Sequence, residues 1–272
     1  MALTETREGL PMKKQVAEQS FELQGDSNAA LLFLHGFTGT PSEIYPTAAL
    51  VNQQSGCTVS GIVLPGHGTT PEDLDNTSWR DWTAAVEDEL NRLSTMHQHL
   101  FVAGLSMGGL LSFYAAIQRE DIKGAVSINA PVFTRNPLTT SFFVSALTPL
   151  LGLVKPYYPK NDIDIGLELE KQGRQAYHCY PVKSFRSMLH LRKLVLSGLS
   201  SVTCPALVMQ SLQDEVVNAS SGRHLVNRLK RTQVSYQELE HSTHVATMGD
   251  EMEAIAASIS RFIDEAVQEK GD

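Results

Sequence analysis

The stretch Leu100-Phe101-Val102-Ala103-Gly104-Leu105-Ser106-Met107-Gly108-Gly109 is the part of the sequence that decides the fold. Its four leading apolar residues predict a short buried strand, and the pattern that follows predicts a helix over residues 107–118. Between them the sequence reads Gly-x-Ser-x-Gly, in which the serine lies at the apex of a strained turn and the flanking glycines avoid collisions. Ser106 is therefore predicted to be a nucleophile at the end of a strand.

The helix after Ser106 directs its free N–H groups and its positive dipole end at whatever the serine attacks. A tetrahedral intermediate needs such donors for its oxyanion, and the N–H of Met107 is expected to be one of them. The second donor is expected in His35-Gly36-Phe37-Thr38-Gly39, which follows an apolar run at residues 31–34. Because its glycines allow a close approach, we expect Gly36 to line the substrate site and the N–H of Phe37 to donate.

An acid and a histidine should follow such a serine in that order along the chain. The predicted strand at residues 206–210 leads into a loop that holds Asp214 and its neighbour Glu215, and Asp214 lies where the acid is required. Beyond the last predicted strand, His241 and His244 are both candidates for the base, with His244 deeper in the loop. The base must accept the serine proton while the acid orients its other ring nitrogen.

The remaining histidines and the cysteines do not indicate a metal site or a disulfide framework. His35 and His67 lie in glycine-rich turns, and we expect them to brace the backbone rather than to transfer protons. Cys57, Cys179 and Cys204 are odd in number, widely spaced and flanked by apolar or aromatic residues, which predicts buried free thiols. No metal and no cofactor is expected.

The chain as a whole alternates short apolar runs with longer amphipathic ones, which predicts an α/β fold with a mostly parallel sheet flanked by helices. Strands are expected at residues 30–34, 58–63, 100–103, 125–129, 206–210 and 235–239. Helices are expected at residues 43–53, 79–93, 107–118, 220–228 and 251–267. The alternation of strands and helices stops at residues 132–201, a mostly helical stretch interrupted by prolines. We therefore assign residues 19–131 and 202–270 to the core and residues 132–201 to a cap insertion. Residues 1–18 form a polar lead-in.

Composition excludes several classes of partner. The 272 residues carry 30 acidic and 22 basic side chains, a net charge of −8, and the densest basic patch is only the four residues 228–231, so no nucleic-acid partner is expected. Residues 1–23 lack the apolar core of a signal peptide. The apolar residues within 142–154 are too few to span a bilayer and are expected to dock the cap or to line an acyl-chain pocket. We expect a cytoplasmic protein without a transmembrane segment.

Taken together, these motifs resemble those of the bacterial carboxylesterases and monoacylglycerol lipases of the α/β-hydrolase superfamily, over residues 29–263. The resemblance rests on His35-Gly36-Phe37-Thr38-Gly39, Gly66-His67-Gly68, Asp81-Trp82, Gly104-Leu105-Ser106-Met107-Gly108-Gly109, Ile128-Asn129-Ala130, Asp214 and His244-Val245-Ala246-Thr247. It implies an eight-stranded type of α/β-hydrolase core with a small helical cap and no cofactor. It also implies Ser106, Asp214 and His244 as catalytic triad, with Phe37 and Met107 as oxyanion donors.

The same resemblance bears on the substrate. Bacterial monoacylglycerol lipases are expected to bind the glycerol head with a cap glutamate and an asparagine, and Asn129 fits the second role as a substrate-binding residue. Where the glutamate is expected, this chain reads Gly173-Arg174-Gln175. We therefore expect a serine carboxylesterase acting on short- to medium-chain esters, with a monoacylglycerol lipase as the alternative. An acyltransferase or a non-catalytic ligand receptor fits less well, and the sequence leaves the oligomeric state open.

Overall fold

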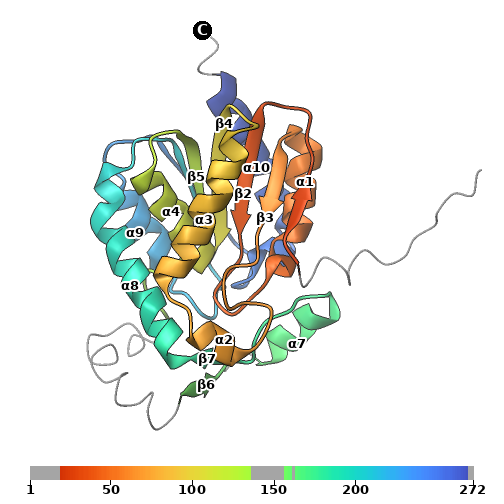
Figure 1. Ribbon diagram of the computed structural model, residues 1–272, viewed down its shortest axis with the longest axis vertical. Helices are drawn as coiled ribbons and strands as arrows, with labels where there is room; N and C mark the ends of the chain where they lie inside the picture. Colours follow the sequence, from red (N-terminus) through yellow and green to blue (C-terminus); the bar gives the residue numbers. More distant parts are fainter. Residues whose placement is uncertain (1–18, 136–155, 161–162, 269–272) are drawn as a thin grey trace, which may run out of the picture.

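A twisted sheet forms the centre of the molecule. The computed structural model describes residues 19–135, 156–160 and 163–268, and within them the sheet has seven strands (Figure 1). In spatial order they are β1 (Phe21–Leu23), β3 (Thr58–Gly61), β2 (Ala29–Leu34), β4 (His99–Leu105), β5 (Ile122–Ile128), β8 (Ala206–Ser211) and β9 (Val234–Leu239). Only the edge strand β1 is antiparallel to its neighbour, which confirms the mostly parallel sheet expected from the sequence.

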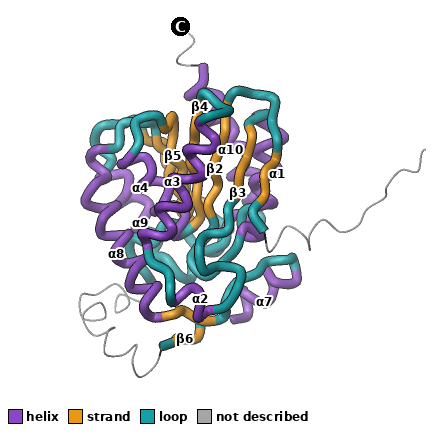
Figure 2. The backbone as a smooth tube through the Cα atoms, viewed as in Figure 1, coloured by secondary structure: helices purple, strands orange, loops and turns teal. Residues whose placement is uncertain are grey.

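Helices cover both faces of this sheet (Figure 2). On one face lie α3 (Trp79–Ser94), α4 (Met107–Gln118), α8 (Val182–Gly198) and α9 (Ser220–Arg228), and on the other lie α1 (Tyr45–Ser55) and α10 (Met252–Gln268). Alternate residues of a strand point to opposite faces. Leu32 and Leu34 accordingly pack in one buried cluster with Trp82, and Leu31 and Phe33 pack in the other. Burial on both faces explains why β2 reads as an unbroken apolar run.

Some element boundaries differ from those expected. The helix expected at residues 43–53 is a 3₁₀ turn, η1 (Pro41–Glu43), followed by α1, because Pro46 in the first turn of α1 cannot donate to the preceding turn. The strand expected at residues 58–63 ends at Gly61. The short helix α2 (Pro71–Asp75) was not expected from the sequence.

The stretch expected to be mostly helical also contains strands. Two three-residue strands, β6 (Tyr157–Pro159) and β7 (Cys179–Pro181), pair antiparallel, and α7 (Ile163–Lys171) lies between them in the chain. The proline that ends each strand hid it from pattern analysis. These elements and α2 lie together at one end of the molecule (Figure 1).

Helix α8 begins directly after β7 and contacts α2 at that end of the molecule. Leu191 and Val195 are fully buried and α8 packs against α4, so this helix is part of the layer that covers the sheet. The polar lead-in at residues 1–18 and the apolar residues at 142–154 lie outside the described residues.

The cysteines are free thiols, as expected, but only one of them is buried. Burial raises the pKa of the Cys57 thiol to about 11. Cys179 and Cys204 are half-buried, because the first begins the short strand β7 and the second lies in the loop before β8. Within the described ranges, no helix is both long and apolar enough to cross a membrane.

Candidate active site

Ser106 lies at the turn between β4 and α4 with φ 55° and ψ −116°, a conformation that is strained for any residue with a side chain. A Cβ on Gly104 would lie 2.0 Å from the carbonyl carbon of Gly108, and one on Gly108 would lie 2.2 Å from the carbonyl oxygen of Leu34 in β2. Both glycines are therefore required by the close packing of the turn against its own helix and the neighbouring strand, as the motif predicts.

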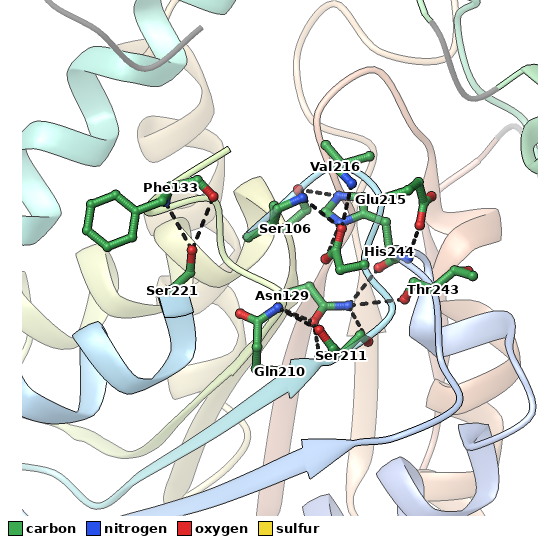
Figure 3. A network of polar contacts seen from close by, with 12 residues as sticks. Ser106, Asn129, Phe133, Gln210, Ser211, Glu215, Val216, Ser221, Thr243 and His244 are labelled. Atoms are coloured by element: carbon green, nitrogen blue, oxygen red, sulfur yellow. Dashed lines mark hydrogen bonds and ion pairs between the residues drawn. The ribbon is translucent and has the colours of Figure 1, made fainter. Parts of the chain in front are cut away.

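The structure brings Ser106, His244 and Asp214 together from three separate loops. The hydroxyl of Ser106 lies 3.0 Å from Nε2 of His244 (Figure 3). Nδ1 of His244 lies 2.8 Å from Oδ2 of Asp214. Asp214 is 1% exposed and Ser106 is 8% exposed. The loops follow β4, β8 and β9, whose carboxyl ends meet at one edge of the parallel sheet.

The two acids next to each other in the sequence have different partners. Oδ1 of Asp214 accepts hydrogen bonds from the backbone N–H groups of Val216 at 2.8 Å and Val217 at 2.7 Å, so the carboxylate is fixed while Oδ2 faces the imidazole. Glu215 accepts the backbone N–H of His244 at 3.0 Å and thus anchors the main chain rather than the ring. The geometry favours Asp214 as the residue that orients the ring.

The two histidines that were candidates for the base also differ. The side chain of His244 is the one that reaches Ser106, as described above. The backbone N–H of His241 donates to Glu251 at 3.0 Å, and His241 itself is exposed at the end of β9. His241 therefore belongs to the turn that positions His244.

Asn129 is fully buried behind the histidine loop. Its amide nitrogen donates to the hydroxyl of Ser211 at 2.8 Å and to the carbonyl of His244 at 2.9 Å, and its Oδ1 accepts the N–H of Ser211 at 2.7 Å (Figure 3). It adopts a positive φ of 51°, which asparagine tolerates better than most residues. This arrangement differs from the substrate-binding role expected from the sequence, because the amide is used to hold β8 and the His244 loop together.

The two expected oxyanion donors belong to segments that adjoin Ser106. Met107 is the first residue of α4, so its N–H has no partner within the helix. A Cβ on Gly36 would lie 3.4 Å from Cβ of Ser106, which shows how closely the loop at residues 35–39 approaches the serine. The ring of Phe37 packs against Trp82, with ring centroids 5.9 Å apart, and stacks on Tyr180 at 6.4 Å. We call residues 35–39 the oxyanion loop.

His35 and His67 brace the turns around this loop, as the sequence analysis expected. Nδ1 of His35 lies 2.9 Å from the carbonyl of Gly36, and its Nε2 accepts the N–H of Leu64 at 3.1 Å, which requires a neutral ring protonated at Nδ1. Burial lowers the pKa of both histidines, and that of His67 falls well below the ordinary value. Two neutral rings therefore pack 4.9 Å apart beneath the oxyanion loop.

Sequence analysis did not single out a buried ion pair close to this loop. Nη2 of Arg174 lies 2.8 Å from Oε1 of Glu43, and Oε2 of Glu43 accepts the N–H of Gly36 at 3.2 Å. In the sequence, Glu43 begins an expected helix and Arg174 stands where a glutamate is expected. Two residues 131 apart in the chain carry no local signal of their pairing.

The electrostatics of the site suit a base that receives the proton of Ser106. Burial by itself would lower the pKa of His244, but the charge of Asp214 and its hydrogen bond to the ring raise it above the ordinary value of 6.5. Glu215 and Glu43 raise it further. An imidazolium formed during the reaction is thus stabilised in place.

A pH profile of kcat/KM should therefore show an acid limb with an apparent pKa above 6.5. Activity is lost as the pH falls through this value, because protonated His244 cannot accept the proton of Ser106. In a Glu215→Gln variant, one negative charge is removed, so the limb should move to lower pH. If the acid limb does not move in this variant, or if its apparent pKa lies below 6.5 in the parent protein, His244 is not the base described here.

No cluster of three or more metal-binding side chains occurs in the part of the chain that the structure describes. The chemistry that the described residues can perform is nucleophilic attack by an activated serine, with backbone amides to stabilise the oxyanion.

Residues 25–251 match the model of the hydrolase family described as serine aminopeptidase, S33. The chain belongs to this serine hydrolase family. Relatives of this family member include the thermostable monoacylglycerol lipase of Bacillus sp. (strain H-257), which is 34% identical over 220 residues, 80% of this chain and 83% of that one. The carboxylesterase of Bacillus subtilis (strain 168) is 25% identical over 252 residues, 92% and 98% of the two chains.

Solved structures of this hydrolase fold agree with the family assignment. A structure from the study of the metagenome-derived lipolytic enzymes LipS and LipT superposes with a TM-score of 0.80 and 29% identity, covering 92% of this chain and 98% of that one. The family member described here therefore has the α/β-hydrolase fold that the sequence resemblance implied, and it is a carboxylic ester hydrolase.

Proposed function

We propose that this protein is a serine carboxylesterase that hydrolyses short- to medium-chain esters through an acyl-enzyme, with Ser106, His244 and Asp214 as its catalytic triad. The observation that carries the proposal is the continuous hydrogen-bonded chain from the Ser106 hydroxyl through both nitrogens of His244 to the buried Asp214. Such a chain at a strained turn is the arrangement that activates a serine hydroxyl.

In the proposed mechanism, the Ser106 oxygen attacks the ester carbonyl while Nε2 of His244 takes its proton. The carbonyl oxygen becomes an oxyanion and accepts hydrogen bonds from the N–H groups of Phe37 and Met107. His244 then gives the proton to the alcohol as the C–O bond breaks, leaving an acyl-Ser106 ester. Water activated by the same imidazole releases the acid and restores the serine.

The alcohol part of the substrate is the point on which two candidates differ. The 34% identical monoacylglycerol lipase favours a glycerol ester. The buried ion pair favours a broader range of alcohols, because Arg174 is tied to Glu43 at the place where a glycerol-binding carboxylate is expected. Both oxygens of Glu43 already accept protein hydrogen bonds. Asn129 is likewise occupied by protein groups. We therefore keep the carboxylesterase as the leading proposal.

The deciding experiment compares kcat/KM on butyryl and octanoyl esters of glycerol, ethanol and p-nitrophenol. Similar values for glycerol and ethyl esters of equal acyl length support the carboxylesterase, and a preference for glycerol above about tenfold supports the lipase. Faster turnover of an amino-acid p-nitroanilide than of any ester would overturn both. Product analysis with added alcohol tests acyl transfer, and repeated turnover of one ester excludes a receptor that only binds.

We further propose that residues 132–201, between β5 and β8, form the insertion that covers the substrate, with α8 as its anchor on the core. The stacking of Tyr180 on Phe37 supports this position. A reducing compartment such as the cytoplasm is consistent with the three free thiols.

A further inference from the structure

The oxyanion loop and the residues just after it are hydrogen-bonded to a short segment of the insertion, residues 174–177. The N–H of Tyr177 donates to the carbonyl of Thr38 at 2.9 Å, and the N–H of Gln175 donates to the hydroxyl of Ser42 at 2.9 Å. The hydroxyl of Thr40 donates back to the carbonyl of Gln175 at 3.2 Å. These contacts join two parts of the chain that are about 135 residues apart in sequence.

A buried ion pair joins Arg174 to Glu43, just beyond the oxyanion loop. Nε and Nη2 of Arg174 lie 2.9 Å and 2.8 Å from Oε1 of Glu43, and the two side chains are 8% and 3% exposed. The other carboxylate oxygen accepts the N–H of Gly36, the residue before the proposed oxyanion donor Phe37. A Cβ on Gly39 would lie 2.2 Å from the same oxygen, so the loop is wrapped around this carboxylate.

Glu43 also connects the loop to the histidine side of the site. Its carbonyl oxygen accepts a hydrogen bond from the hydroxyl of Thr247, three residues after His244. The carbonyl of Thr247 in turn accepts the hydroxyl of Thr47 at 2.7 Å. The oxyanion loop, the His244 loop and the insertion thus meet at a single buried glutamate.

The loop needs such support because its backbone is strained. Thr38 has a φ of 68°, in the left-handed region where a β-branched residue is a clear outlier. A strained residue of this kind persists only where its surroundings hold it. The hydrogen bond from Tyr177 and the contacts of Glu43 with Gly36 and Gly39 provide that support on both sides of Thr38.

We propose that Glu43 and Arg174 are positioning residues that hold the N–H of Phe37 at the oxyanion site, so that the insertion sets the catalytic geometry through Arg174. This inference rests on the proposed function, because it assigns the pair a role in the esterase reaction. A displacement of about 1 Å at a catalytic group can cost about 100-fold in rate. The pair should therefore affect kcat more than substrate binding, since the donors act on the oxyanion and not on the ground-state ester.

The test is the full chain with Arg174→Met, assayed on p-nitrophenyl butyrate with active sites counted by fluorophosphonate titration. Thermal melting is measured in parallel, and rates are taken well below the melting temperature. Arg174→Lys keeps the charge but not the paired donors and should recover part of the loss. Arg119→Met is the matched control, because Arg119 is a poorly exposed arginine paired with Glu87 and Asp121 beside the start of β5, at the opposite end of the parallel strands.

A loss of about fivefold or more in kcat per titrated site, with KM changed by less than about threefold, supports the proposal. A smaller loss of kcat overturns it, even if the melting temperature falls. If Arg174→Met does not fold, the double variant Glu43→Gln/Arg174→Met, which removes both charges of the ion pair, is judged by the same criterion. A parent protein without Ser106-dependent ester turnover would instead mean that the proposed function itself is wrong.

Discussion

Replacing Ser106 with alanine should lower kcat on a p-nitrophenyl ester about a millionfold, the loss seen when a triad nucleophile is removed. The reason is that no other described hydroxyl lies within hydrogen-bond distance of Nε2 of His244. The variant should fold normally, since alanine adds no atoms at a residue already held at φ 55°. Steady-state kinetics and labelling by a fluorophosphonate, read by mass spectrometry, measure the effect.

The control for this variant is Ser112→Ala. Ser112 is a buried serine on the same helix, α4, and its hydroxyl donates to the carbonyl of Val102 at 2.9 Å. Its loss removes a hydrogen bond without touching the site, so turnover should stay within about threefold of the parent while stability falls by about 1 kcal/mol. Ester turnover by Ser106→Ala above about 1% of the parent rate would exclude Ser106 as the nucleophile.

Replacing Asp214 with asparagine should lower kcat about 10⁴-fold. The amide can still accept the N–H groups of Val216 and Val217, so the loop should keep its shape. Its NH₂ group would face Nδ1 of His244, where the carboxylate now lies 2.8 Å away, and would favour the tautomer that cannot accept the serine proton. Kinetics together with the melting temperature separate this effect from unfolding.

The matched control is Glu215→Gln, one residue along the chain. The Glu215 carboxylate accepts a hydrogen bond from the backbone N–H of His244, not from its ring. Glutamine can accept the same hydrogen bond. We expect a loss below about tenfold, because the imidazole keeps its orienting partner. Should Glu215→Gln be the more damaged of the two variants, the roles of the two acids would have to be exchanged.

Much of the site could be predicted from the sequence because its signals are local. The collision that excludes a side chain at Gly104 involves the backbone of Gly108, within a strand, a turn and a helix that are contiguous in the chain, so the Gly-x-Ser-x-Gly motif reports it. Ser106, Asp214 and His244 each follow a strand of the parallel sheet, and the carboxyl ends of these strands share one edge. The apolar run of β2 similarly reports burial on both faces.

Other parts of the molecule had no local signal. Strands β6 and β7 are three residues each and end in proline, so neither has enough residues to show an alternating pattern. Asn129 matched a substrate-binding role in the resemblance, and only the folded loops show that its amide is used by Ser211 and His244. Its full burial could not be inferred from its neighbours in the sequence.

The sequence by itself determined the fold class, the nucleophile and the short sets of acids and histidines that can serve it, because each depends on residues close together in the chain. The sequence and its resemblance already favoured Asp214 over Glu215 and His244 over His241, and tertiary structure supplied the contacts that agree with both choices. Tertiary structure also brought Arg174 to Glu43 beneath the oxyanion loop. Those contacts depend on distances of a few ångströms between loops that lie far apart in the chain, and such distances are set only when the sheet and its helices have packed.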